Sequence, residues 1–445
     1  MFKTLIAAFL LLSGLVHGQT DYAAAAEDVR NGRAKEAIPV LQRRLAESPS
    51  DLKARNLLGI ALMNVGRNAE ARVEFQKALA TDPAFHAALK NLAVDEMVLG
   101  QKAEARRHFE QLLKAVPDDP VAHTYLGEMA YAAASYPEAL AHYQQLAKKS
   151  YPDPYRAGFN LVLVNVSAAN YSAAIQLGEL LIREHPTAEL YNLVARGYEG
   201  AGRTQQAYDS LRSAIQIDPQ DERNYIDLMS LCLTHENWDL SLEISEIAMR
   251  NVLRAYRVRL QRGAVFAMKG MLQNAESEFR ESAQMAPESS LPIVALGLVK
   301  MDMKKPEEAA ELLRARRALD SNDYLVNWML AEALTEAGQE STEAIAALQD
   351  AVRLNQSVPE PHVLLGKLLL KRGERDRAVR EFEAALKLKP DDNTAAYQLA
   401  MIYRQVGNLD RAEKLMSIAQ KAASVPEAGL ARRQELVKII RQASQ

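Results

Sequence analysis

The segment from Asp51 to Ala84 reads DLKARNLLGIALMNVGRNAEARVEFQKALATDPA, and its pattern recurs along most of the chain. Apolar residues at helical spacing precede Gly66, resume after it and stop at Pro83. Because glycine favours a tight turn and proline cannot continue a helix, the segment predicts two helices joined by a short turn. The unit is about 34 residues long, which is the length of a repeat rather than of a domain.

Several sets of residues keep one register at intervals of 33 to 35 residues. Small residues recur in the predicted second helices, at Ala37, Ala71, Ala105, Ala139, Ala174, Ala207, Ser241, Ala275, Ala309, Ala344, Ala378 and Ala412. Glycines mark the turns at Gly32, Gly66, Gly100, Gly202, Gly270, Gly338, Gly373 and Gly407. Small residues such as Gly59 in the first helices, with bulky partners such as Phe75 in the second, predict helices that approach closely.

This period, the small-residue positions and the Asp82-Pro83 and Asp218-Pro219 unit ends resemble the tetratricopeptide repeat (TPR) family. The resemblance implies an all-α fold, an α-solenoid forming a right-handed superhelix of about twelve helix-turn-helix repeats. It also implies a concave groove lined mainly by the first helix of each pair. We assign residues 19–426 to this solenoid.

Some units depart from the pattern, so their boundaries near 155–186, 222–253 and 290–323 are open. Glu236 and Lys304 stand where a turn glycine is expected. Gly158 and Gly178 replace the bulky pair between two helices, which predicts a loosely packed joint. Residues 427–445 are interpreted as a C-terminal capping helix and tail, with basic side chains in water at Arg432, Arg433, Lys438 and Arg441.

The first 18 residues have the pattern of a cleaved secretory signal peptide. Lys3 precedes an apolar run over residues 5–12, and compact Val16 and Gly18 lie before a cut at Gln19. The stretch is shorter than the roughly 20 apolar residues that span a bilayer. We therefore expect an exported protein of the secreted or periplasmic bacterial type, periplasmic or extracellular, with no stable membrane span after cleavage.

Composition and motifs favour binding over chemistry. The net charge of -3 does not favour nucleic acid as a partner. No glycine-rich phosphate loop occurs, and His108 and His142 are the only histidines at the same place in consecutive repeats. A metal site usually needs three or four ligands. We therefore expect no catalytic residues, no metal site and no cofactors, and we interpret the protein as non-enzymatic.

Candidate groove residues are those of the first helices that the family geometry turns away from the second helix. An apolar strip is predicted at Val94, Met97, Tyr131, Phe159, Leu163 and Val166, followed by basic residues at Arg196, Arg223 and Arg257. Such a surface suits an acidic and hydrophobic segment of a partner protein. The alternative is that neighbouring helices cover the strip, in particular the run from Leu161 to Val164, which is apolar on every side.

The function that these features favour is a protein-protein interaction scaffold or adaptor outside the cytoplasm, which binds segments of other proteins in its concave groove. The alternative is an accessory subunit of polysaccharide or cell-wall export and assembly machinery. Aromatic platforms would then hold a glycan, and the aromatic content of 6% makes that alternative weaker.

Overall fold

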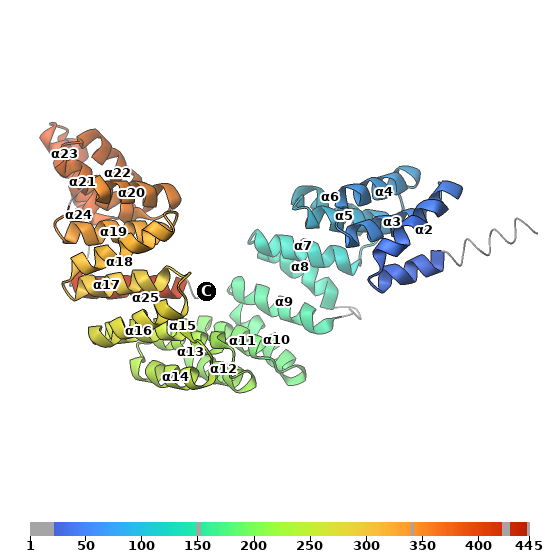
Figure 1. The fold of residues 1–445 in the computed structure, drawn as a ribbon, viewed down its shortest axis with the longest axis horizontal. Helices are drawn as coiled ribbons and strands as arrows, with labels where there is room; N and C mark the ends of the chain where they lie inside the picture. The colour runs from blue at the N-terminus through green and yellow to red at the C-terminus, as the bar shows by residue number, and fades with distance from the viewer. Residues whose placement is uncertain (1–21, 148–152, 340–341, 421–427, 443–445) are drawn as a thin grey trace, which may run out of the picture. The chain divides into compact units, whose positions relative to one another are not determined.

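The computed structural model describes residues 22–147, 153–339, 342–420 and 428–442 (Figure 1). Within these ranges every regular element is an α-helix, and no helix there is long and apolar enough to cross a membrane. The chain divides into two compact units, one ending at Ala207 and the other beginning at Tyr208. The predicted signal peptide, residues 1–18, lies outside the described residues.

The first unit is a series of antiparallel helix pairs. Helical residues 22–30 precede α2 (Ala34–Glu47). The next pairs are α3 (Leu52–Asn64) with α4 (Asn68–Thr81), α5 (His86–Val98) with α6 (Lys102–Ala115), α7 (Pro120–Ala132) with α8 (Tyr136–Ala147), and α9 (Pro154–Ser167) with α10 (Tyr171–Glu184). The unit continues through α11 (Ala188–Gly200) into α12 (Thr204–Ile217), within which the boundary falls.

The second unit repeats the arrangement. Its pairs are α13 (Glu222–Thr234) with α14 (Trp238–Asn251), α15 (Tyr256–Met268) with α16 (Leu272–Met285), α17 (Leu291–Asp302) with α18 (Pro306–Leu319), α19 (Tyr324–Glu336) with α20 (Thr342–Leu354), α21 (Pro359–Lys371) with α22 (Arg375–Leu388), and α23 (Asn393–Gln405) with α24 (Leu409–Gln420). A last helix, α25 (Ala428–Gln442), follows. The all-α solenoid predicted from the sequence is confirmed.

The turn inside each helix pair has a residue with positive φ. The eight glycines of the turn column have φ between 72° and 80°, and Ala134, Ala169, Glu236 and Lys304 occupy the same place with φ between 54° and 62°. Glycine adopts this left-handed conformation without steric cost, whereas the other residues do so under strain. The described turns therefore number twelve, as the repeat spacing predicted, and Glu236 and Lys304 do mark turns.

Aspartates start many of the first helices. The side chain of Asp51 accepts a hydrogen bond from the backbone N–H of Ala54, and that of Asp392 accepts one from Ala395. Asp119, Asp153, Asp221 and Asp323 cap their helices in the same way. Each cap satisfies a backbone donor that the first turn of a helix leaves free.

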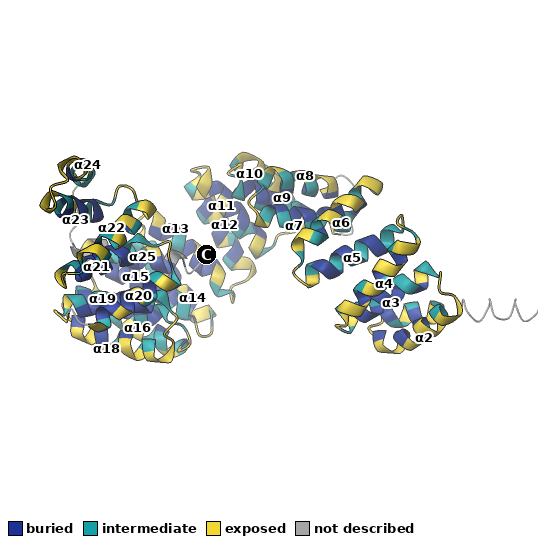
Figure 2. Ribbon diagram, turned by 90° about the horizontal axis from the view of Figure 1, so that it is seen from above, coloured by how far each residue is buried: buried dark blue, intermediate teal, exposed yellow. Residues whose placement is uncertain are grey.

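Small side chains lie where the paired helices meet. Ala71 and Ala378 are fully buried, as the small-residue column predicted. A Cβ atom on Gly59 would lie 2.4 Å from the Phe75 ring, so only glycine fits at that crossing. In Figure 2 the buried residues lie on the faces where paired helices meet, and the exposed residues lie on their outer faces.

The joint between α9 and α10 is well packed, and the prediction of a loose joint there is wrong. A Cβ atom on Gly178 would lie 2.2 Å from Cγ2 of Val194, and one on Gly158 would lie 3.2 Å from a Leu181 methyl. Val194 belongs to α11, in the next repeat. A neighbouring helix therefore fills the space that the missing bulky pair leaves.

Helix α25 occurs within the predicted range 427–445, but the structure places it away from the end of the array. Its main helix contacts are with α15 and α17. Arg432 and Arg433 form ion pairs rather than facing water, whereas Lys438 is exposed. The side chain of Arg441 lies outside the described residues. The apolar side of the helix explains this position, because Leu436, Ile439 and Ile440 are buried in the core of the second unit.

Candidate partner-binding grooves

The apolar strip of the first unit lies on three consecutive first helices. Val94 and Met97 are on α5, Tyr131 is on α7, and Phe159 and Leu163 are on α9. All five side chains are half-buried. Val94 and Met97 pack against the hydrophobic cluster that contains Phe109 and Leu126, and this contact buries part of each side chain. The remaining surface of the strip is accessible, so these residues stay candidates for contact with a partner.

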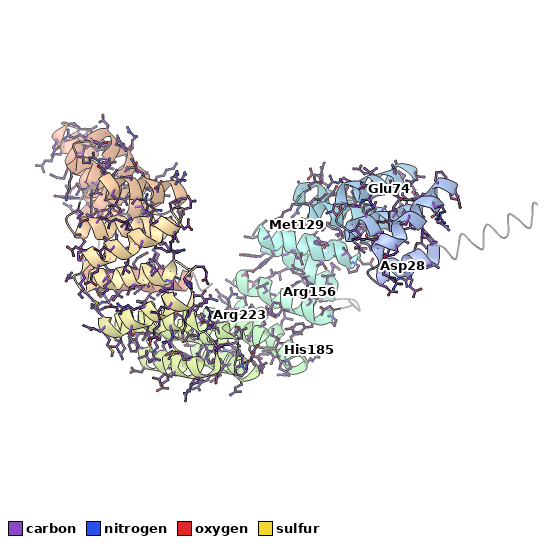
Figure 3. The ribbon with its side chains drawn as sticks, viewed as in Figure 1. Asp28, Glu74, Met129, Arg156, His185 and Arg223 are labelled. Carbon is purple, nitrogen blue, oxygen red and sulfur yellow. The ribbon has the colours of Figure 1, made fainter. Side chains whose placement is uncertain are left out.

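Hydrogen bonds and ion pairs link neighbouring first helices beside the strip. The hydroxyl oxygen of Tyr131 lies 3.1 Å from Oγ of Ser167 on α9. The guanidinium of Arg156, also on α9, lies 3.4 Å from a carboxylate oxygen of Glu128 on α7. Figure 3 labels Arg156, together with Met129 of α7. These contacts therefore connect adjacent repeats along the face of the first unit that carries the strip.

Val166 does not belong to the accessible strip. Only 7% of its surface is exposed, and its Cγ2 atom lies 3.7 Å from the position of a Cβ atom on Gly197. Val166 is thus a core residue between α9 and α11. Within the apolar run, Leu161, Val162 and Val164 are likewise buried, because α8, α10 and α11 all pack against α9. Leu163 alone of this run keeps a half-buried side chain.

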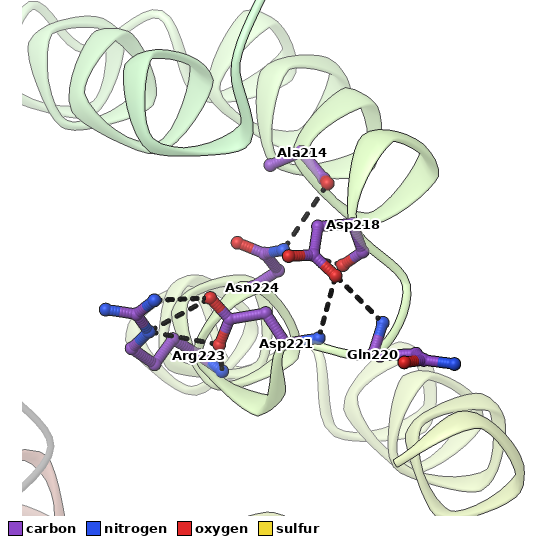
Figure 4. Close-up of polar contacts among 6 residues, drawn as sticks. All are labelled: Ala214, Asp218, Gln220, Asp221, Arg223 and Asn224. Carbon is purple, nitrogen blue, oxygen red and sulfur yellow. Dashed lines mark hydrogen bonds and ion pairs between the residues drawn. The ribbon is translucent and has the colours of Figure 1, made fainter.

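The predicted basic residues lie in both units. Arg196 is exposed on α11 in the first unit. Arg223 on α13 and Arg257 on α15 belong to the second unit and occupy positions equivalent to each other in their repeats. Arg223 donates hydrogen bonds to both carboxylate oxygens of Asp221 (Figure 4). The hydrogen bond from Arg223 also lowers the pKa of Asp221. Arg223 therefore points at a carboxylate of its own repeat.

Acidic residues that the sequence interpretation did not include accompany these arginines. The backbone N–H of Arg257 donates to Oε1 of Glu222, at 2.8 Å, and burial raises the pKa of Glu222. Arg259 lies 2.9 Å from carboxylate oxygens of both Glu278 and Glu281. Asp221 and Glu222 thus place acidic side chains beside the predicted basic residues Arg223 and Arg257.

The histidines pair with other groups. Nδ1 of His108 lies 2.7 Å from Oε2 of Glu96, and Nδ1 of His142 lies 2.9 Å from Nδ1 of His123. Burial, followed by the neighbouring His123, lowers the pKa of His142. His108 and His142 do not contact each other in these pairings. Within the described ranges there is no group of three or more histidine, cysteine, aspartate or glutamate side chains that could hold a metal ion.

A second set of groove residues lies beneath α25. Nε of Arg433 lies 2.7 Å from a carboxylate oxygen of Asp302 on α17, and Arg432 lies 2.6 Å from one of Glu336 on α19. The sequence reasoning missed these acidic partners. The signal that could have suggested them is in α25 itself, where two adjacent arginines precede Leu436, Ile439 and Ile440 on one side of a helix.

Paired helices joined by left-handed turns and packed through small residues define an α-solenoid of helical-hairpin repeats. The chain belongs to the tetratricopeptide repeat family. Models of that family match residues 28–93, 90–154, 130–189, 294–359 and 363–426, which together span more than half of the chain. The matches lie in both units, and the resemblance proposed from the repeat spacing is confirmed.

Individual relatives share only part of the chain. DnaJ homolog subfamily C member 3 of Rattus norvegicus is 26% identical over 216 residues, which are 47% of this chain and 37% of that protein. Type IV pilus assembly protein PilF of Pseudomonas aeruginosa is 29% identical over 148 residues, 33% of this chain and 59% of PilF. The chain thus spans less than two thirds of the length of these relatives.

Solved structures resemble the fold at low sequence identity. The crystal structure of yeast Tom70 gives a TM-score of 0.45 at 18% identity and covers 96% of each chain. That of YrrB, described as a TPR protein with an unusual peptide-binding site, gives a TM-score of 0.33 at 19% identity and covers 42% of this chain and 96% of YrrB. Proteins of the tetratricopeptide repeat family are typically protein-interaction scaffolds without enzymatic activity.

Proposed function

We propose that this protein is a non-enzymatic scaffold or adaptor that acts outside the cytoplasm and binds segments of partner proteins along the first helices of its repeats. The observation that carries the proposal is the half-buried apolar strip of the first unit, Val94, Met97, Tyr131, Phe159 and Leu163. An extended or helical partner segment would remove its accessible surface from water. The pilus assembly protein among the relatives supports an assembly role in a bacterium.

Photo-crosslinking in the producing cell tests this proposal. A photoreactive amino acid replaces Tyr131 on the strip, and in a matched control it replaces Leu180, an apolar residue of α10 that is 58% exposed. We expect the Tyr131 site to capture a defined protein and the Leu180 site to capture none. Equal capture at both sites would contradict binding along the first helices. Capture of a glycan at Tyr131 would favour the polysaccharide-assembly alternative.

Location is tested independently by N-terminal sequencing of the protein recovered from the cell envelope and the medium. Lys3, the apolar run and the compact Val16 and Gly18 favour cleavage, so we expect the mature chain to begin at or near Gln19. An intact Met1 on protein found in the cytoplasm would reject the proposed export while leaving the scaffold role open.

A further inference from the structure

Helix α25 covers the face of the second unit that corresponds to the apolar strip of the first. Met301 lies three residues before its turn, as Met97 and Tyr131 do, and Leu298 lies six residues before it, as Val94 does. Met301 and Leu298 are 0% and 2% exposed, whereas the strip residues of the first unit are half-buried. Both belong to the hydrophobic cluster that includes three apolar residues of α25, namely Leu436, Ile439 and Ile440. This groove therefore already contains a helix.

The contacts of α25 define the kind of ligand that the groove accepts. The ion pairs of Arg432 with Glu336 and of Arg433 with Asp302 connect one turn of the helix to two successive repeats. Asp302 has a side chain only 5% exposed, so Arg433 pairs with a buried carboxylate group. Apolar residues then follow on the same helix, three, six and seven positions after Arg433. The groove thus binds a helix that has basic residues in its N-terminal half and apolar residues along one side.

The match between α25 and the groove is incomplete. Glu332 of α19 lies among Arg432, Glu336 and Glu435, so α25 brings an acidic residue to a groove that is already acidic. Burial raises the pKa of Glu332 to about 7; Glu435 and Glu336 add to the rise, while Arg432 and the Trp328 indole oppose it. Glu435 is paired with Lys438 of α25 at 3.3 Å, so a helix with a basic residue at this place would lose that pair. It would also remove one repulsion and supply a cation to Glu332.

We propose that the groove formed by α15, α17 and α19 binds an amphipathic helix of a partner protein, and that α25 occupies it until that helix displaces α25. The partner helix has two adjacent basic residues, an apolar side matching Leu436, Ile439 and Ile440, and a third basic residue where α25 has Glu435. This inference rests on the proposed scaffold function and deepens it, because it names the chemistry of one bound segment. It also makes α25 an internal competitor of the partner.

Binding of a synthetic helix to the full chain tests this displacement. The probe is a fluorescent peptide with the sequence of residues 428–442, made in a second form with Glu435→Lys. Its affinity is measured for the wild-type chain and for the full chain with Leu436→Asp and Ile440→Asp, which removes the apolar anchors of α25. The control chain has Lys414→Gln and Gln420→Asp, two exposed positions of α24 with the same total change in charge.

We expect the chain without anchors to bind the peptide about tenfold more tightly than the wild-type and control chains do. The Glu435→Lys peptide should bind still more tightly. Asp302→Arg in the chain without anchors should weaken binding of the wild-type peptide about tenfold, and an Arg433→Asp peptide should recover part of the loss. Equal affinity for all chains, or weaker binding of the Glu435→Lys peptide, would overturn the proposal.

Two further measurements cover the remaining outcomes. If the chain without anchors loses its helical circular dichroism, hydrogen exchange of the wild-type chain tests the displacement of α25 instead. Exchange of the α25 amides well before those of α17 supports displacement. Exchange of both helices together overturns it. A wild-type dimer by light scattering that the anchor substitutions abolish would place α25 of a second copy in the groove and overturn a foreign ligand. If the peptide fails while Tyr131 still crosslinks a protein, the scaffold function stands and only the helix ligand is rejected.

Discussion

The Cα of Gly59 on α3 faces the ring of Phe75 on α4 so closely that a Cβ atom there would lie 2.4 Å from Cε1 of that ring. The same relationship recurs between Gly127 and Tyr143, Gly263 and Phe279, and Gly366 and Phe382. In each of these four hairpins the missing side chain on the first helix makes room for a large ring from the second. Because the ring fills the space that the glycine leaves free, this pair sets the distance between the two helices.

The Gly59→Ala variant should destabilise the first unit. Overpacking a core typically costs about 1 to 3 kcal/mol, which exceeds the roughly 0.5 to 1 kcal/mol that alanine gains over glycine within a helix. The matched control is Gly197→Ala, where the nearest atom would be at an ordinary 3.4 Å and the helical gain should prevail. Urea denaturation measures both; a stable Gly59→Ala variant would contradict the packing described for α3 and α4.

The Ala134→Gly variant should be more stable than the wild type. Ala134 has a φ of 55°, a left-handed conformation that costs an L-residue about 1 to 2 kcal/mol, and glycine relieves that strain at an entropic cost of about 0.5 to 1 kcal/mol. The neighbouring Ala133 has a φ of -87°, so Ala133→Gly should lower stability instead. Opposite shifts in the unfolding midpoint are expected, and shifts of the same sign would count against strain at Ala134.

The Phe159→Asp variant should weaken the partner captured at Tyr131. Burying an aromatic side chain is worth roughly 1.5 to 3 kcal/mol, and about 1.4 kcal/mol corresponds to tenfold in affinity. Since Phe159 is only half-buried and its ring centroid lies 6.2 Å from that of Tyr155, the helix should tolerate the change better than a core position would. Leu180→Asp on α10 is the control. Retained helicity with unchanged affinity would remove Phe159 from the binding strip, and unfolding of the hairpin would make Phe159 a core residue.

The Glu332→Gln variant should change how the second unit responds to pH. The pKa of Glu332 is raised from 4.5 to about 7, so the folded chain keeps a proton there that the unfolded chain has already lost. Through this group, stability falls as the pH rises from about 4.5 to about 7. The variant should therefore match the wild type near pH 4.5 and exceed it above pH 7, because the amide carries no charge.

Thermal unfolding across this pH range measures the difference, with Glu307→Gln on the exposed side of α18 as the control. Arg432, Glu336, Glu435 and Trp328 all influence Glu332 and are unchanged in both variants. A stability difference between the Glu332→Gln and wild-type chains that does not vary with pH would show that Glu332 titrates normally and would contradict the acidic groove beneath α25.

The sequence by itself determined the repeat, the turns and the family. These features depend on neighbouring residues: Gly66 sets a local backbone conformation, and Ala71 and Phe75 lie one helical turn apart on the same helix. Even Lys304, which lacks the expected glycine, could be placed at a turn because the spacing of the units around it is fixed. The positions of the strip residues Met97 and Tyr131 were predicted from the same repeat register. Their role in binding stays a prediction.

Only the tertiary structure decided which side chains of that strip are accessible and where the last helix lies. Val166 is buried because Gly197 of the next first helix leaves room for it, and this depends on packing between repeats. Arg433 meets Asp302, which is 131 positions earlier, because α25 returns to α15 and α17 instead of ending the array. A periodic sequence specifies contacts within a repeat and with the next one, but a helix outside the period can pack against any groove of suitable charge and apolar surface.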